Sequence, residues 1–149
     1  MKIFISLLSL VIFCSCSDNN FNKDTLSFEL RLADAQYQSN LIEMNLYNSD
    51  QKFFVSDSIY LNNSDIASAE ILDWESQPKV KVVLKSEGRQ KFAVFTKKFI
   101  GKNAAIIIDD KLLSAPRINA EINSGELIII GFFNHEDALR IADGIVPDN

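Results

Sequence analysis

An α+β fold is predicted by this sequence: a mixed β-sheet with two amphipathic helices packed on one of its faces. Residues 86–100 and 136–142 each carry apolar side chains at helical spacing, with polar side chains on the opposite side. Short apolar or alternating segments, bounded by turn residues, lie between and before these two stretches. From residue 79 onward the predicted order is therefore strand, helix, strand, strand, strand, helix.

The segment before residue 79 is less regular. Residues 26–32 alternate between leucine or phenylalanine and polar side chains, which predicts a half-buried strand. Beyond it we expect irregular structure at 33–49 and then two short strands, 52–57 and 58–61, on either side of a turn. Asn63-Ser64-Asp65 is expected to cap a helical turn that begins at Ile66, and a strand is expected at 69–74.

The first predicted helix follows a clear strand. Residues 79–85 alternate, with valines and a leucine inward and lysines outward. Ser86 then offers an N-cap, and Gly101 offers a C-cap after a helix that ends at about Ile100. We expect the buried face of this helix to consist of Phe92, Phe95 and Phe99.

Turn residues divide the last part of the chain. Asp109-Asp110 is predicted as a tight turn between an apolar strand at 104–108 and a returning segment at 111–118, in which Pro116 marks an edge or a bulge. Ser124-Gly125 is predicted as the turn before a strand at 127–130. Asn134 is predicted to cap the last helix, whose expected buried face is Ala138, Ile141, Ala142 and Ile145.

The N-terminal residues have the pattern of a bacterial lipoprotein signal. Lys2 supplies a positive charge, and the apolar run at 3–13 is too short to span a bilayer as a helix. A small residue, Ser15, precedes Cys16, whereas the bulky Phe13 precedes Cys14. We therefore predict cleavage between Ser15 and Cys16 and lipidation of Cys16. The alternative is an ordinary secretory signal in which the cysteines are incidental.

This assignment divides the chain into a signal peptide at 1–15, a lipidated cysteine with a polar, flexible tether at 16–25, and one domain at 26–149. It places the protein in the bacterial cell envelope, lipid-anchored to the inner or outer membrane and facing the periplasm or the surface. The domain contains no cysteine, so disulfides and thiolate metal sites are excluded from it. Loss of the signal removes one of 15 basic residues and none of 20 acidic ones, so the net charge goes from −5 to −6, which argues against nucleic acid as a partner.

An ordered set of motifs resembles a known family, the head of the first periplasmic domain of SecD and of the fused SecDF proteins. The motifs are Lys91-Phe92-Ala93, Phe95-Thr96, Ile100-Gly101-Lys102, the strand at 105–109, Leu113-Ser114-Ala115-Pro116, Gly131-Phe132-Phe133 and the helix at 136–142. The resemblance is strongest over 79–147 and weaker over 26–78. Two turn glycines of the family are replaced, by Asp110 and by Ser124, and aspartate tolerates the left-handed backbone that such a turn requires.

The resemblance implies a binding role. The family's head is thought to hold and release an emerging preprotein, while flanking membrane helices use the proton gradient. The sequence shows no counterpart of those helices, so the resemblance implies only a surface that holds a polypeptide. The implied partners are exported polypeptides, Sec translocon components or another envelope protein.

No catalytic, cofactor or metal site is predicted. His135 is the only histidine of the chain, and no motif supplies it with an orienting partner or a nucleophile. Asp109 and Asp110 are adjacent carboxylates, but a calcium site needs more oxygen ligands at defined spacing. Phosphate-binding glycine loops, serine-nucleophile elbows and paired metal-binding histidines do not occur in the sequence.

Residues 79–102 form a basic stretch with eight basic residues and one acidic residue, Glu87. Two interpretations fit this stretch. The first is electrostatic docking, either on anionic lipid headgroups or on an acidic partner. The second is the ordinary solvated side of a strand and a helix. The lysines of the possible docking face are Lys79, Lys81, Lys91, Lys98 and Lys102.

A second candidate surface follows the Asp109-Asp110 turn. Leu112, Leu113, Ser114, Ala115 and Pro116 lie where an exposed sheet edge could pair with an extended polypeptide. The other interpretation places one leucine in the core and the other under a loop.

The sequence as a whole favours a non-enzymatic, membrane-anchored binding lipoprotein that assists secretion. The alternative is a structural or surface lipoprotein that uses the same fold for an unrelated protein interaction. A polar pocket around His135 would instead support an envelope hydrolase.

Overall fold

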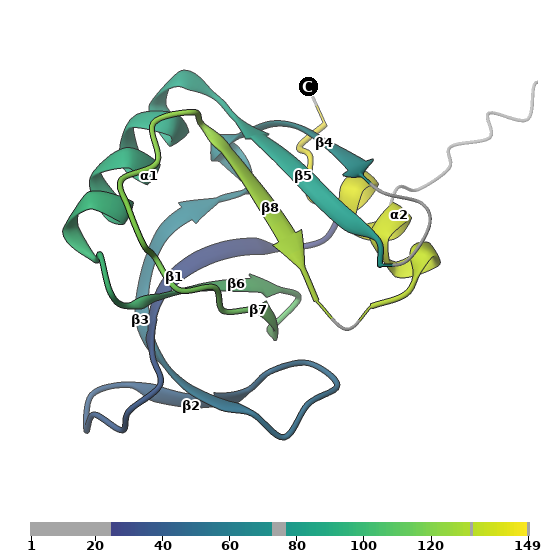
Figure 1. The fold of residues 1–149 in the computed structure, drawn as a ribbon. Coiled ribbons are helices and arrows are strands. Elements are labelled where there is room, and N and C mark those ends of the chain that lie inside the picture. Colours follow the sequence, from purple (N-terminus) through teal and green to yellow (C-terminus); the bar gives the residue numbers. More distant parts are fainter. Residues whose placement is uncertain (1–24, 73–76, 132, 149) are drawn as a thin grey trace, which may run out of the picture.

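The computed structural model describes residues 25–72, 77–131 and 133–148. In chain order the elements are β1 (Phe28–Asp34), β2 (Ile42–Asn45), β3 (Lys52–Asn62), the 3₁₀ turn η1 (Asn63–Asp65), β4 (Ile66–Leu72), β5 (Lys79–Leu84), α1 (Ser86–Lys98), β6 (Asn103–Ile108), β7 (Lys111–Ser114), β8 (Glu126–Ile130) and α2 (His135–Gly144). Figure 1 shows the two helices on opposite sides of the molecule, with strands between them.

Five strands form a curved sheet in the order β2-β3-β1-β6-β7. The central strand β1 pairs antiparallel with β3 on one side and with β6 on the other. The sheet curls until its ends meet, because Leu46 and Leu112 form a parallel bridge and the Tyr47 N–H donates to the Leu112 carbonyl at 2.8 Å. The curled part encloses a small apolar cluster made of Ala33, Phe53, Val55, Ala105, Ile107 and Leu112.

The other three strands form an antiparallel sheet in the order β4-β5-β8. Its inner face contributes Val80 and Val82 of β5 to the main core, which also contains Phe28 and Leu30 of β1. Helix α1 packs against β3 and β5, and α2 packs against β4 and β5 (Figure 1). The two helices therefore fill the space between the two sheets from opposite sides.

The α+β class with two amphipathic helices is confirmed, and so is the element order from residue 79 onward. The strands belong to two sheets, however, and the paired strands are all antiparallel. Alternation of apolar residues shows which face of a strand is buried, but it does not show which strand lies beside it. The predicted Phe92 and Phe95 are buried and Phe99 is partly buried, while the predicted face of α2 is buried.

Two predictions for the first half of the chain were wrong. The predicted break at residues 57–58 does not occur, because β3 is one continuous strand whose register shifts against β1 absorb the polar residues 56–58. Residues 33–49 also contain a strand, β2, in which Ile42 and Met44 alternate with Glu43 and Asn45, but this alternation spans only four residues and the side chains are mostly exposed.

Two predicted caps also differ from the structure. The helical turn is Asn63–Asp65 itself, capped by Asn62, and Ile66 begins β4. Lys85 is the N-cap residue of α1, and its side chain makes no cap because an ammonium group has no acceptor for the first N–H groups of the helix. The Lys85 N–H donates to the Asp65 carbonyl at 2.8 Å, and the backbone is extended there. Asn134 caps α2 as predicted, through a capping box with Asp137.

Candidate functional site

The predicted contact segment at 112–116 lies at the edge of the five-stranded sheet, but its leucines are not exposed. Leu112 is 1% exposed, inside the small apolar cluster, and Leu113 is 4% exposed, inside the main core. At Leu112 the edge is already occupied by the bridge to Leu46. The expectation of apolar side chains displayed on an open edge is therefore wrong for both leucines, whereas Ala115 and Pro116 retain some exposure.

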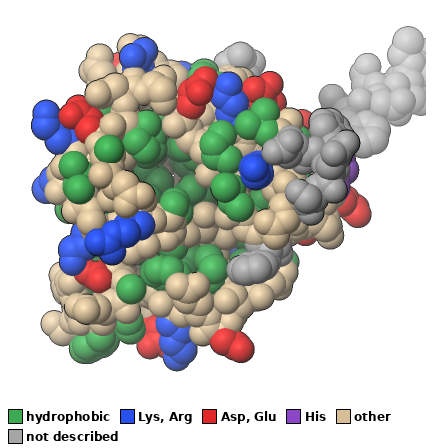
Figure 2. All heavy atoms as spheres, in the orientation of Figure 1, with side chains coloured by type: hydrophobic (Ala, Val, Ile, Leu, Met, Phe, Trp, Pro, Cys, Tyr) green, Lys and Arg blue, Asp and Glu red, His purple; other side chains and the backbone are tan. Residues whose placement is uncertain are grey.

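A groove lies beside this segment. Its cavity has a volume of about 420 Å³ and is bounded by α1, β6, β8 and the chain at 116–122. Figure 2 shows hydrophobic side chains gathered around a hollow in this face of the molecule. The apolar lining includes Leu30, Phe92, Ile106, Ile118, Ile122 and Leu127.

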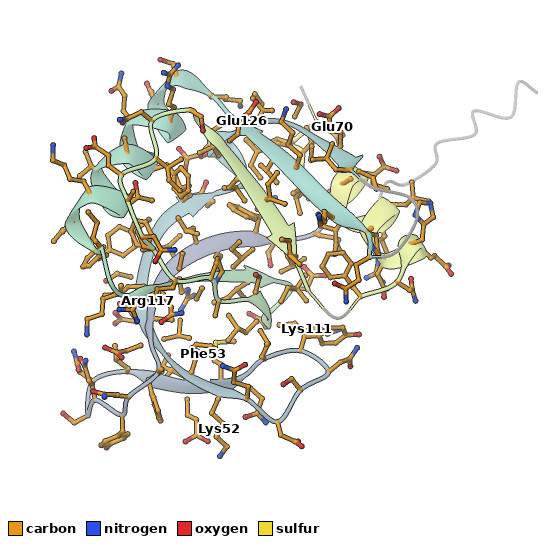
Figure 3. The ribbon with its side chains drawn as sticks, in the orientation of Figure 1. Lys52, Phe53, Glu70, Lys111, Arg117 and Glu126 are labelled. Carbon is orange, nitrogen blue, oxygen red and sulfur yellow. The ribbon has the colours of Figure 1, made fainter. Side chains whose placement is uncertain are left out.

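The charged residues of the groove lie at its rim. Arg117 and Glu126 both line the cavity and are exposed, and Figure 3 shows them well apart, with Glu126 at the start of β8 and Arg117 in the chain below it. The floor is therefore apolar, while one positive and one negative group mark the rim.

Hydrogen bonds fix the outer wall of the groove, residues 116–123, to α1. The Thr96 hydroxyl accepts from the Ile122 N–H at 2.9 Å and donates to the Phe92 carbonyl at 2.9 Å. The Arg89 guanidinium donates to the Asn123 carbonyl at 2.6 Å. Lys97 and Glu121 form an ion pair at 3.5 Å. The wall is thus held in place from one helix, and the groove stays open between it and β8.

Replacement of Thr96 by valine is expected to loosen this wall. Thr96 is 1% exposed, so valine fits the space but leaves the Ile122 N–H without its acceptor. The expected loss in the free energy of unfolding is about 1–3 kcal/mol, measured by urea denaturation. Thr96→Ser keeps the hydroxyl and is the matched control, which should lose less than the valine variant. Equal losses in both variants would contradict the role given to the hydroxyl.

The inner wall of the groove is β8, the last strand of its sheet. Leu127 and Ile129 point into the core, whereas Ile128 and Ile130 are 37% and 46% exposed. A separate, smaller hollow of about 150 Å³ lies between Ile130 and the segment at 113–115. β8 approaches β7 closely at Gly131, where a Cβ atom would lie 2.6 Å from the Leu113 carbonyl oxygen. The sequence predicts β8 as a strand, but nothing in it shows that one edge of β8 borders a groove.

The predicted basic face is divided among several ion pairs. Lys81 lies 3.0 Å from Glu126 and 3.6 Å from Glu70, and the hydrogen bond with Glu126 raises the pKa of Lys81. Lys91 lies 2.7 Å from Asp65, whose hydrogen bond raises the pKa of Lys91. These lysines are therefore neutralised locally by carboxylates.

The other lysines of that face lie apart from these pairs in the fold. Lys98, near the end of α1, has its ammonium group 5.1 Å from the centre of the Phe99 ring. Lys102 follows α1 and pairs with Asp34 of β1, and Lys79 begins β5. The five lysines thus come from β5, α1 and the loop after it, which fits a solvated surface better than one concentrated docking face.

The pair of Asp34 and Lys102 gives an expected pH dependence. The hydrogen bond from Lys102, followed by that from the Gln36 N–H, lowers the pKa of Asp34. A carboxyl group with a lowered pKa in the folded state stabilises that state above its unfolded pKa, and this contribution is lost as the pH falls through the folded value. Lys102→Met should therefore lose up to about 1 kcal/mol at pH 7 and nothing well below pH 4, by urea denaturation at both pH values.

The control for this measurement is Lys52→Met, which breaks a more exposed ion pair with Glu43. Its loss at pH 7 should be smaller than that of Lys102→Met. A loss for Lys102→Met that is the same at both pH values would contradict the assignment.

The structure gives no support to a catalytic or metal site among the described residues. His135 is exposed at the start of α2 and does not line the groove. Asp109 and Asp110 have positive φ angles of 45° and 62°, and the Asp109 carboxylate accepts from the Ser27 N–H at 2.8 Å. The described part of the chain contains no group of three histidine, cysteine or acidic residues placed to hold a metal.

Two predictions concern the region before residue 25. Ser15 and Cys16, the predicted cleavage and lipidation residues, lie outside the described residues. In the part of the chain that the structure describes, no helix has the length and apolar character needed to cross a membrane.

Comparison of the sequence with known proteins finds relatives that are named as protein translocase subunits. The chain is 38% identical over 103 residues to the protein translocase subunit SecD of Leptotrichia buccalis, a match that covers 68% of this chain and 25% of that protein. It is 35% identical over 83 residues to the protein translocase subunit SecDF of Thermus thermophilus, covering 55% of this chain and 11% of that protein. The chain thus spans a quarter or less of the length of these relatives.

Comparison of the structure gives the same fold. A solved structure of SecDF, described as a membrane component that enhances protein export, superposes with a TM-score of 0.65 at 22% identity, over 83% of this chain and 63% of that one. At this identity the likeness shows the fold alone. The family model of the SecDF P1 head subdomain matches residues 37–144. The chain therefore belongs to the SecDF P1 head subdomain family.

Proposed function

We propose that this chain is a non-enzymatic lipoprotein of the bacterial cell envelope, whose domain holds segments of exported polypeptides in the groove between β8 and residues 116–122. The observation that carries the proposal is the groove itself, an apolar hollow of about 420 Å³ with one charge of each sign at its rim. Binding pockets for small molecules and cofactors are commonly apolar hollows of this size with a few polar groups around them, and one or two apolar side chains of a polypeptide have similar dimensions.

The family membership supports this proposal for the substrate class. The relatives are named as subunits of a protein translocase, and the matched part of this chain is the head subdomain. An exported polypeptide exposes apolar side chains before it folds, and an apolar floor would bury them transiently. The same groove can serve Sec translocon components or another envelope protein that presents an apolar segment.

The predicted N-terminus supports the proposal for location. A lipid on Cys16 and the polar tether at 16–25 would keep the domain close to the membrane surface where polypeptides emerge. Stable anchoring requires more than one acyl chain, and a mature lipoprotein carries several.

Photocrosslinking in living cells tests the proposed substrate class. A photoreactive residue at Ile122, which lines the groove and is 37% exposed, should capture many different exported polypeptides or translocon subunits. A probe at Val94 is the matched control, because Val94 is an apolar residue of α1 that is 66% exposed outside the groove. Capture of one unrelated envelope protein at Ile122, or no capture above the Val94 control, would refute the proposal and favour a surface lipoprotein with a separate partner.

A further inference from the structure

The backbone of β8 has a defined free side. The Leu84 N–H donates to the Gly125 carbonyl at 2.8 Å, and the register of β5 with β8 continues from this bonded pair. In an antiparallel ladder the residues that exchange hydrogen bonds alternate with residues whose N–H and C=O groups point away. Leu127 and Ile129 therefore bond to β5, whereas the backbone groups of Ile128 and Ile130 point to the other side.

Among the described residues no strand pairs with that other side, although the Glu126 N–H there donates to the Ser124 hydroxyl at 3.2 Å. β8 is the last strand of its sheet, and its recorded partner strand is β5. The free side borders the cavity, since Leu127 and Ile128 both line it. Native edge strands usually carry a proline, a bulge or an inward charge that blocks pairing, and the stretch at 127–130 contains only leucine and isoleucine. An unprotected edge next to an apolar hollow is the arrangement that strand addition requires.

We infer that an extended polypeptide segment adds to β8 as a fourth, antiparallel strand, which extends the sheet to β4-β5-β8-peptide. This inference rests on the proposed function and specifies how the polypeptide is held. The hydrogen bonds come from the peptide backbone, so they are independent of the sequence of the bound segment. A groove that serves many exported chains needs that independence.

The two faces of the added strand meet different surroundings. Side chains opposite Leu127 and Ile129 point inward over the apolar floor, with Ile106, Ile118 and Ile122 below them. Side chains opposite Ile128 and Ile130 point outward, to the same face of the sheet as Ile128 and its cross-strand partner Lys81 on β5. The segment that fits best is therefore apolar at every second residue and polar at the others.

Backbone N-methylation tests the hydrogen bonds directly. The probe is a short synthetic peptide of alternating threonine and valine, titrated into the full chain in detergent and followed by fluorescence anisotropy. With valines inward, an antiparallel strand directs the threonine N–H groups to β8. N-methylation of a central threonine should weaken binding about tenfold or more, because it removes a hydrogen bond and adds a methyl group at the contact. N-methylation of the neighbouring valine should change binding by less than about threefold.

The outcomes separate the inference from the proposed function. If the unmethylated peptide binds and both methylated peptides bind equally well, the groove holds polypeptides through side chains alone and the inference is wrong. If the unmethylated peptide fails to bind, the inference is also overturned, and photocrosslinking from Ile122 decides separately whether the proposed function survives.

Variants of β8 provide the second measurement. Ile128→Pro removes an N–H that faces the groove and leaves the ladder with β5 complete, so peptide affinity should fall about tenfold in a folded protein. Ile128→Ala removes the side chain and retains the N–H, and it should keep most of the affinity. The parent chain could instead dimerise in a concentration-dependent way, and Ile128→Pro could abolish this dimerisation. That result would show that a second copy of the chain occupies this edge, and it would overturn the inference.

Discussion

Asn63→Asp is expected to destabilise the domain by about 2–4 kcal/mol, although it exchanges one amide group for an oxygen. The Asn63 carboxamide joins three separate segments. Its oxygen accepts from the Phe28 N–H at 2.9 Å, and its nitrogen donates to the carbonyls of Leu26 and Ile145 at 2.8 Å each. Aspartate keeps the acceptor, but it places a carboxylate oxygen against two carbonyl oxygens.

Thermal and urea denaturation of Asn63→Asp measure this effect. Asn40→Asp is the matched control, because Asn40 is exposed before β2 and the same change there should have little effect. The difference in the free energy of unfolding between Asn63→Asp and the parent chain should become smaller as the pH falls, since a protonated carboxyl group can donate a hydrogen bond again. A loss equal to that of the control would mean that Asn63 does not bridge these segments.

Gly88→Ala is the second substitution with a large expected effect, and its sign is opposite to that of ordinary helix propensity. Alanine inside a helix is usually better than glycine by about 1 kcal/mol. Here the new Cβ atom would lie 2.8 Å from both the Cβ atom and the carbonyl oxygen of Asp65. We therefore expect a net loss of about 1–3 kcal/mol in the free energy of unfolding.

The contact at Gly88 cannot relax easily because Asp65 is held from several sides. Its carbonyl accepts from the Lys85 N–H at 2.8 Å, and its carboxylate accepts from the Asn62 N–H at 3.1 Å and from Lys91 at 2.7 Å. Gln90→Ala, at an exposed position of the same helix, is the control and should be close to neutral. An increase in stability for Gly88→Ala would show that α1 and η1 are not packed this closely.

Periodicity predicts the second half of this fold well because most of its elements bury a regular face. Val80 and Val82 alternate inward in β5, and Ala138, Ile141 and Ala142 recur at helical spacing in α2. The first half is harder to predict. The apolar alternation of β2 spans only four mostly exposed residues, and β3 keeps its pairing across polar residues 56–58 only through register shifts that depend on β1.

The candidate site depends on relations between strands that periodicity cannot show. The apolar character of Leu112 and Leu113 is evident in the sequence, but their burial follows from the curl of the five-stranded sheet and from its bridge to Leu46. Ile128 and Ile130 are equally apolar, yet they remain partly exposed because their side chains point away from the core, to the outer face of the three-stranded sheet. Which apolar strand borders a groove is set by sheet order, which one sequence does not reveal.

Backbone amide hydrogen exchange at β8 is the measurement that tests the central claim most directly. In the free full chain, the Ile128 and Ile130 amides should exchange fast and the Leu127 and Ile129 amides slowly, because only the latter bond to β5. The alternating threonine–valine peptide should then slow exchange at Ile128 and Ile130. Slow exchange at Ile128 in the free chain, or exchange there that the bound peptide leaves unchanged, would contradict a free edge that receives polypeptides.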